Sequence, residues 1–198
     1  MTRTKHDLRS EATRQKLVTA ARTLFGARGY AAVGTEEIVR AAGVTRGALY
    51  HQFRDKADLF AAVAEEVEAE IAERIAAGAR AAADPVEALR AGARLFLDAC
   101  GEPEVERIIL LDAPAVLGWE AWRDLAGRYG LGLVRLGLQS AIEAGVIVPQ
   151  PIAPLAHILI GALDEAALYV AGAEDRAAAR QECAAIFDRI LRGFAAET

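Results

Sequence analysis

Apolar residues recur along this chain every three or four positions rather than every second position, which predicts helices and not strands. The first predicted helix runs from about Ser10 to Arg28, the second from about Thr35 to Ala42, and the third from Arg46 to Phe53. Gly43 ends the second helix, and Thr45 is a suitable N-cap for the third. A sharp Ala-Gly-Val turn therefore joins two short helices.

The rest of the chain carries the same periodicity. A fourth helix opens at Asp55 and continues past Ile75, with one apolar stripe and a glutamate-rich face that turns to solvent. Asp84 followed by proline is typical of a helix start. Five further helices are predicted at residues 85–101, from Pro103 to about Pro114, and at 119–144, 152–171 and 174–195. The sequence therefore predicts an all-α fold of about nine helices.

The composition supports this fold class. Of the 198 residues 54% are hydrophobic but only 6% are aromatic, and alanine supplies much of the apolar mass. Alanine is the best helix former, so helices are favoured over strands. Charged residues make up 26%, an ordinary share that argues against intrinsic disorder. The length is sufficient for one or two packed domains.

Charge is distributed unevenly along the chain. The net charge is -5, but residues 1–54 hold ten Lys and Arg against four Asp and Glu, a net of +6. Residues 55–198 hold 13 against 24, a net of -11. Such asymmetry indicates a nucleic-acid-binding segment joined to an acidic body. The same pattern also fits a solvated basic helix without a partner, so charge alone leaves both interpretations open.

Cysteine use and the apolar runs bear on localisation. Only Cys100 and Cys183 occur, without paired spacing, which is typical of free thiols in a reducing cytosol. The first residues are charged with no apolar stretch behind them, so no secretory signal is expected. The uncharged run at 144–163 is broken by prolines, and a buried helix is favoured over a membrane span. We expect a cytoplasmic protein without a membrane partner.

Residues 22–60 carry the most specific pattern in the chain. Its fixed elements are Leu24-Phe25, Gly29-Tyr30, Ile38, Ala42-Gly43-Val44, Leu49-Tyr50, Phe53, Lys56 and Leu59-Phe60. This pattern closely resembles the DNA-binding segment of TetR-family transcriptional regulators. The resemblance implies an N-terminal three-helix DNA-binding domain at residues 1–56, with its helix-turn-helix at about 34–53. A helical effector-binding and dimerisation domain would then occupy residues 57–198.

The third predicted helix has the size and side chains of a helix that enters the major groove. Arg46 can make a bidentate contact with guanine, and small residues after it permit close approach. Thr35 and Thr45 can cap their helices and still offer hydroxyls to phosphates. By the resemblance, backbone contacts come from Thr35, Thr45, Tyr50 and Lys56, and base contacts from Arg46, Gly47, Ala48 and His51 or Gln52. Gly34 stands where the family often has Ser or Thr, so a phosphate contact expected there lacks its hydroxyl.

The C-terminal body offers less specific candidates. Effector-binding candidates are polar or aromatic residues in apolar surroundings, namely Asp112, Trp119, Trp122, Tyr129 and His157. Each has a structural alternative: Asp112 could cap a helix, the aromatic rings could be core, and a buried, hydrogen-bonded histidine is the favoured interpretation of His157. Apolar stripes run along the last two helices, and periodicity leaves open whether they meet each other or another chain. The resemblance implies dimer contacts on these helices, with the candidates Leu155, Leu159, Cys183, Ile186, Phe187, Ile190 and Phe194.

The sequence shows no zinc-ligand spacing, phosphate-binding loop or paired nucleophile and base, so we expect no metal, no cofactor and no enzymatic activity. The resemblance implies a homodimeric regulator bound to double-stranded operator DNA. The predicted function is that of a repressor released from its operator by a small, mainly apolar effector. Two alternatives remain: a ligand-independent DNA-binding protein and a helical protein-interaction protein.

Overall fold

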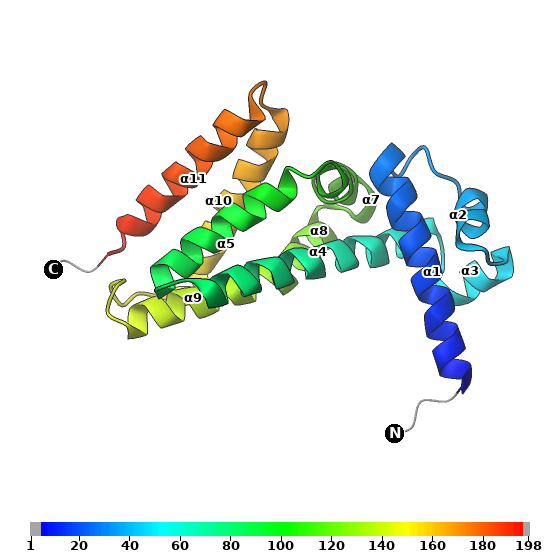
Figure 1. Cartoon of the computed structure of the whole chain (residues 1–198), viewed down its shortest axis with the longest axis horizontal. Helices are drawn as coiled ribbons and strands as arrows, with labels where there is room; N and C mark the ends of the chain where they lie inside the picture. The colour runs from blue at the N-terminus through cyan, green and yellow to red at the C-terminus, as the bar shows by residue number, and fades with distance from the viewer. Residues whose placement is uncertain (1–4, 196–198) are drawn as a thin grey trace. The chain divides into compact units, whose positions relative to one another are not determined.

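The computed structural model describes residues 5–195, with side chains from residue 7 onward, and these residues form nine continuous helical segments (Figure 1). Two of the nine contain a π-helical turn, labelled η, between α-helical parts. The segments are α1 (Lys5–Arg28), α2 (Thr35–Ala42), α3 (Arg46–Gln52), α4 (Lys56–Ala81), α5 (Pro85–Cys100), α6-η1-α7 (Pro103–Val105, Glu106–Asp112, Ala113–Leu117), α8-η2-α9 (Trp119–Ala126, Gly127–Leu131, Gly132–Glu143), α10 (Ile152–Gly172) and α11 (Arg176–Arg192).

The all-α prediction is confirmed, and most helix bounds agree with it. One difference is that α1 begins at Lys5 rather than near Ser10. Another is that the helix after Pro103 does not stop at Pro114 but continues to Leu117. Pro114 stands in the first turn of α7, where a missing backbone N–H is tolerated, and the helix before it has widened to a π-turn.

Packing divides the chain into two compact units. Unit 1 consists of the chain through Val67 together with Pro103–Trp122, and unit 2 consists of Glu68–Glu102 together with the chain from Arg123 onward. Each unit is thus built from two separate stretches of sequence, and α4 contributes residues to both. The predicted functional division after residue 56 remains a prediction, because these units describe packing alone.

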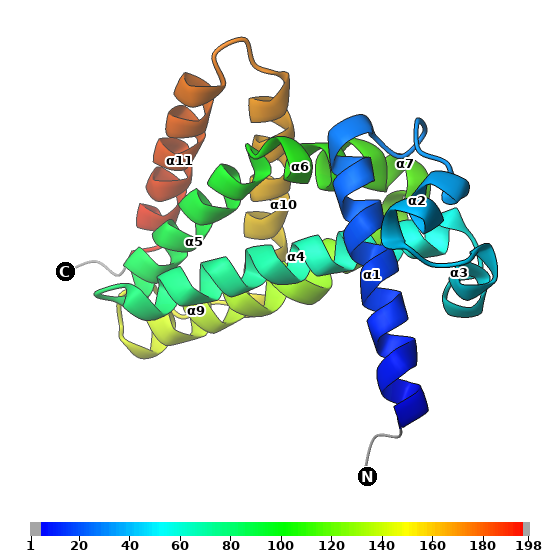
Figure 2. The ribbon, with the colours of Figure 1, turned by 45° about the vertical axis from the view of Figure 1, so that its right-hand side comes forward.

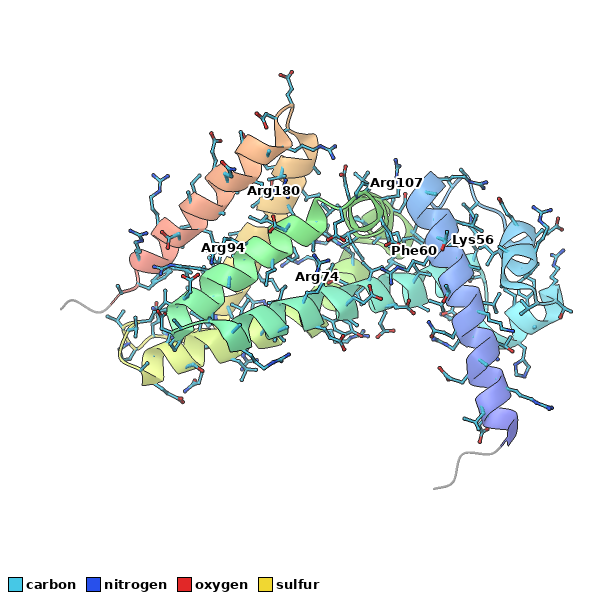
Figure 3. The ribbon with its side chains drawn as sticks, in the orientation of Figure 1. Lys56, Phe60, Arg74, Arg94, Arg107 and Arg180 are labelled. Carbon is cyan, nitrogen blue, oxygen red and sulfur yellow. The ribbon has the colours of Figure 1, made fainter. Side chains whose placement is uncertain are left out.

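Unit 1 is centred on a cluster of three aromatic rings. Phe25 of α1 lies 5.4 Å from Phe60 of α4, and Tyr30 lies within 5.6 Å of both, measured between ring centroids. Leu17 and Leu49 are also fully buried in this unit, so α1 packs against α3 as well as α2. Rings at this separation and tilt pack favourably, which fixes the end of α1 against the start of α4 (Figure 3).

The turn between α2 and α3 depends on a glycine. Gly43 has a φ of +64°, and its N–H together with that of Val44 bonds back to the carbonyl groups of Arg40 and Val39. This is a Schellman-type helix end, which requires the left-handed conformation that glycine adopts without strain. Thr45 then caps α3 by accepting a hydrogen bond from the Ala48 N–H at 3.2 Å. The predicted turn chemistry and the Thr45 cap are confirmed.

Unit 2 packs α5, α9, α10 and α11 around a single apolar core (Figures 1 and 2). Two glycines lie close to neighbouring helices: a Cβ at Gly137 of α9 would meet Leu89 of α5 at 2.6 Å, and one at Gly130 of η2 would meet Ile160 of α10 at 2.8 Å. A side chain at either position would require its neighbour to move. Gly132, by contrast, has open space around it.

Helix α10 is long and apolar enough to cross a membrane on length and composition alone. Its burial gives it another role, because one face belongs to the core of unit 2. The buried residues on that face are Leu155, Ala156, Leu159, Leu163, Ala167 and Val170.

Replacing Gly43 by Ala should destabilise the protein, because a side chain at φ +64° is strained whatever the space around it. The expected loss in the free energy of unfolding is about 1 kcal/mol, measured by urea denaturation. Gly47→Ala is the matched control: Gly47 lies inside α3 with room for a Cβ, so the same added methyl should be neutral or stabilising. Equal stabilities of the two variants would contradict the role given to Gly43.

Candidate DNA-binding surface and internal cavity

The exposed face of α3 carries most of the residues predicted to read DNA. Arg46, Gly47, Tyr50 and His51 are all exposed, while Leu49 between them is fully buried. Leu49 and Phe53, two fixed elements of the sequence pattern, both belong to the core. Helix α3 therefore anchors itself through one face and leaves the other free, as a helix that enters a groove requires.

Arg46 has two weak partners on this surface. Its guanidinium lies 5.6 Å from the centroid of the Tyr50 ring and 3.6 Å from the Glu36 carboxylate at the start of α2. Both ionic side chains are mostly exposed, so this pair contributes little stability. The Arg46 guanidinium therefore lies at the surface of α3 and makes no strong bond to another residue of the protein among the contacts described.

Two of the predicted contact residues have partners inside unit 1. The amide nitrogen of Gln52 donates to the hydroxyl of Ser10 at 2.7 Å, which joins α3 to α1. The ammonium of Lys56 donates to the carbonyl groups of Tyr30 and Val33, each at 3.0 Å, and lies 3.9 Å from the centroid of the Tyr30 ring (Figure 3). Lys56 thus holds the loop between α1 and α2 in place, whereas the resemblance implied that it contacts the DNA backbone.

Thr35 is half-buried and is the first residue of α2, and the N-cap is Gly34. No side chain caps this helix, so the prediction that Thr35 caps α2 was wrong. A Cβ at Gly34 would meet no atom within 4 Å, and its φ of -94° suits any residue. A serine or threonine would therefore fit at position 34, and steric hindrance does not explain why glycine stands there.

Asp112 is a structural residue of unit 1. Its carboxylate accepts a hydrogen bond from the backbone N–H of Tyr30 at 2.7 Å. Nearby, Arg22 of α1 makes a bidentate ion pair with Glu104, at 2.9 and 3.2 Å. Residues 103–122 are thereby fastened to α1 and to the loop that follows it. Asp112 was an effector candidate, but in the structure its carboxylate holds the loop after α1. Sequence spacing could not reveal this contact, because Asp112 and Tyr30 are 82 residues apart.

The other effector candidates separate into different places. Trp122 is buried in unit 1 with Trp119 beside it at 5.0 Å, and the Trp119 side chain is largely exposed. His157 is exposed on α10, so its interpretation as a buried histidine was wrong. Only Tyr129 of the five predicted residues lines the cavity described next.

Unit 2 contains a cavity of about 550 Å³. It is formed by the second half of α4, by α5, by η2 and α9, and by α10, with one residue from α11. Most of the lining is alanine, leucine and isoleucine, and three aromatic rings add to it, those of Phe96, Tyr129 and Phe187. The volume lies in the range of pockets that hold small organic ligands.

Two carboxyl groups break the apolar lining. The glutamates of α4 were predicted to face solvent, and for Glu68 this was wrong: its side chain is only 6% exposed. Burial together with the charge of Asp164 raises the pKa of Glu68 to about 7. Burial also raises the pKa of Asp164 on α10 to about 6, although Arg123 opposes this shift. Among the described residues, none donates a hydrogen bond to the Glu68 carboxyl. The buried thiol of Cys100 has a raised pKa because of burial and the same two carboxyl groups.

The predicted dimer residues divide into an inner and an outer set. Leu155, Leu159 and Phe187 lie in the core of unit 2, so their assignment to a dimer contact was wrong. Helical periodicity could not tell which stripe faces the chain's own core. Cys183 and Phe194 are half-buried, and Ile186 and Ile190 are exposed. Two further exposed residues of α10 join this outer set, Ile158 and Tyr169.

Comparison with known proteins gives a consistent result. Residues 17–63 match the family model "Bacterial regulatory proteins, tetR family", and residues 86–194 match "Tetracyclin repressor-like, C-terminal domain". A solved TetR-family transcriptional regulator from Pectobacterium atrosepticum is 36% identical, with a TM-score of 0.85 over 98% of this chain and 99% of that one. The chain belongs to the TetR family.

Two further proteins resemble this chain, one over a shorter stretch and the other at lower identity. The transcriptional regulator AcrR of Shigella flexneri is 40% identical over 82 residues, which span 41% of this chain but only 38% of AcrR. The structure of RolR in complex with resorcinol is 24% identical, with a TM-score of 0.75 over 96% of each chain, and shows a shared fold. This TetR-family protein is therefore a DNA-binding transcriptional regulator and not an enzyme.

The buried carboxyl of Glu68 should make the stability of this regulator fall as the pH rises. Its pKa is about 7 in the folded chain against an ordinary 4.5, so the folded state binds more protons between these values. From about pH 5 to pH 8 this residue alone should cost on the order of 2–3 kcal/mol of unfolding free energy. Glu68→Gln should remove that loss, measured by urea denaturation across this pH range.

Glu143→Gln, which neutralises an exposed carboxylate of α9, is the control and should follow the parent protein. Asp164 contributes in the same direction at lower pH, so the Gln variant should retain a smaller decline. Parallel curves for the parent and Glu68→Gln would contradict the assignment.

Proposed function

We propose that this regulator is a cytoplasmic homodimer that represses transcription from its operator and is released when a small ligand occupies the cavity of unit 2. The observation that carries the proposal is the cavity of about 550 Å³, lined mainly by apolar side chains and large enough for an organic ligand. The name of the matched C-terminal family model, which is repressor-like, supports the repressing role.

The proposed DNA contacts follow from the exposed face of α3. Arg46 would read guanine, with Gly47 and Ala48 permitting close approach and His51 reaching a neighbouring base. Thr35, Thr45 and Tyr50 would contact phosphates. Gln52 and Lys56 would act as positioning residues, because their polar tips are already bonded to α1 and to the loop after it.

Arg46→Ala should weaken operator binding by about 1–3 kcal/mol, roughly 5- to 150-fold, and relax the base preference at one position. Its thermal stability should match that of the parent protein, since the Arg46 side chain is mostly exposed. Lys56→Ala should instead lower the stability of unit 1, because two carbonyl groups lose their donor. Fluorescence anisotropy on operator DNA and thermal denaturation separate these two effects.

Arg94→Ala is the charge-matched control, because Arg94 pairs with Glu87 on the surface of unit 2 (Figure 3). It should change neither operator affinity nor base preference. If Arg46→Ala and Arg94→Ala bound the operator equally well, the reading role of Arg46 would be refuted.

The proposed dimer interface uses the exposed apolar residues of α10 and α11. Ile158 and Tyr169 on α10 are 66% and 60% exposed, and Ile186 on α11 is 52% exposed. Apolar side chains in such a group are typical of an interface that a second copy covers. A two-fold symmetric dimer would supply two α3 helices, one for each half-site of an operator.

Ile186→Glu should convert the dimer into monomers, since a charge would be buried against the partner copy. The mass measured by light scattering should halve, and operator affinity should fall because one half-site is lost. Leu111→Glu adds the same charge to an exposed leucine of unit 1 and should leave the mass unchanged. A dimeric Ile186→Glu protein would show that another surface carries the interface.

Ligand release would be a shift between two populations of the regulator. A ligand that prefers the state with poor operator affinity lowers that affinity by its own preference, typically ~5- to 150-fold. A ligand-responsive role is compatible with the fold, since RolR, which shares it, has been solved with resorcinol bound.

The experiment that tests the proposal is a selection of bound fragments from genomic DNA, followed by binding measurements at two salt concentrations. A near-palindromic site bound far above random DNA supports the operator-specific role, and log affinity should fall with log salt by about 0.9 per neutralised phosphate. A compound that fills the cavity should then weaken binding.

Two other outcomes favour the alternatives. Equal affinity for operator and random DNA would indicate a ligand-independent DNA-binding protein. Folded dimers without any DNA enrichment would indicate a helical protein-interaction protein.

A further inference from the structure

The carboxyl groups of the cavity are not explained by an apolar ligand alone. Glu68 is buried, lines the cavity and has no hydrogen-bond donor among the described residues. Asp164 lines the same cavity and is close enough to Glu68 for their charges to interact. A buried carboxylate without a partner is unfavourable, so a ligand that supplies the missing partner gains affinity from it.

We propose that the cavity binds a lipophilic amine, a molecule with an apolar body and one protonated nitrogen that lies against Glu68 and Asp164. This inference rests on the proposed function, in which the cavity is the effector site, and it names the chemical class of the effector.

The apolar body of such a ligand has a suitable lining. Ile71, Ala72, Ile75 and Ala76 follow Glu68 along α4 and all contribute to the cavity wall. The rings of Phe96, Tyr129 and Phe187 add flat apolar surface, and the face of an aromatic ring also attracts a cation. A single molecule can therefore be held at one end by charge and along its length by apolar contact.

The cationic side chains near the cavity leave this acidic end open to a ligand cation. Arg80 lines the cavity but is exposed to solvent, and it stands twelve residues beyond Glu68, about 18 Å along α4. Arg123 acts on Asp164 and lowers its pKa, yet burial outweighs it, and it is absent from the groups that act on Glu68. Glu68 therefore remains the carboxyl that lacks a neighbouring cation.

The test compares three probes that share one apolar body: 4-phenylbutylamine, 4-phenylbutan-1-ol and 4-phenylbutyrate. Affinities for the full chain are measured by isothermal titration calorimetry at pH 8, where both carboxyl groups are ionised and the amine is still protonated. The amine should bind at least about tenfold more tightly than the alcohol, and the acid more weakly than the alcohol, because the charges of the site and probe attract or repel.

Glu68→Gln should abolish the preference for the amine while leaving the affinity for the alcohol unchanged, which also shows that the cavity is intact. Asp164→Asn should reduce the preference partly. Glu143→Gln, outside the cavity on α9, should preserve it. At pH 7 the amine should release up to about half a proton from Glu68, seen as a dependence of the binding heat on the buffer, and the Gln variant should lose this release.

Equal binding of amine and alcohol by the parent protein would overturn the inference, as would an amine preference that survives Glu68→Gln. Absence of binding by all three probes at millimolar concentration would overturn it too. None of these measurements uses DNA, so a failure here is distinct from a failure to find an operator. Operator binding with no amine preference would leave the regulator role standing and remove only the ligand class.

Discussion

Helix α4 is continuous and packs in both compact units, and the rest of the structure depends on this constraint. Helix α4 contributes Phe60 to the aromatic cluster of unit 1 and Ile71 to unit 2, without a break in its hydrogen bonding. Its first residue, Lys56, fastens the loop after α1, and the first residue it contributes to unit 2 is Glu68, which lines the cavity. Helix α4 therefore supplies residues both to the support of the DNA-binding helices and to the acidic part of the cavity.

The second support of the DNA-binding surface is polar and comes from late in the sequence. The loop between α1 and α2 offers a backbone N–H at Tyr30 to Asp112, and its carbonyl groups at Tyr30 and Val33 to Lys56. A loop whose backbone groups are bonded on both sides has few alternative conformations. Because α2 follows this loop directly, the residues that hold it also determine where the helix-turn-helix stands in unit 1.

Sequence reasoning succeeded where the determining chemistry was local. The Gly43 turn, the Thr45 cap and the Asp84-Pro85 helix start each follow from residues within a few positions of one another. It failed where a side chain bonds to a residue far away in the sequence. The backbone N–H that Asp112 binds lies 82 residues away, and the Ser10 hydroxyl that Gln52 binds lies 42 residues away. The cavity could not be predicted either, because it depends on which faces of five helical segments meet. Periodicity shows that a stripe is buried, but not against which element.

Retaining Glu68 in an apolar cavity is costly for the folded state, and under the proposed function this cost would have a use in regulation. Burying an ionised carboxyl without a partner is unfavourable, and a neutral amide of the same shape would avoid that cost at neutral pH. A ligand cation that pairs with the ionised group would offset the cost of burying it, so binding would stabilise the folded chain. Glu68 belongs to α4, the helix that begins at Lys56. In the proposed mechanism, a ligand that prefers one of two states of the regulator would therefore act on a helix that also contributes residues to the DNA-binding unit.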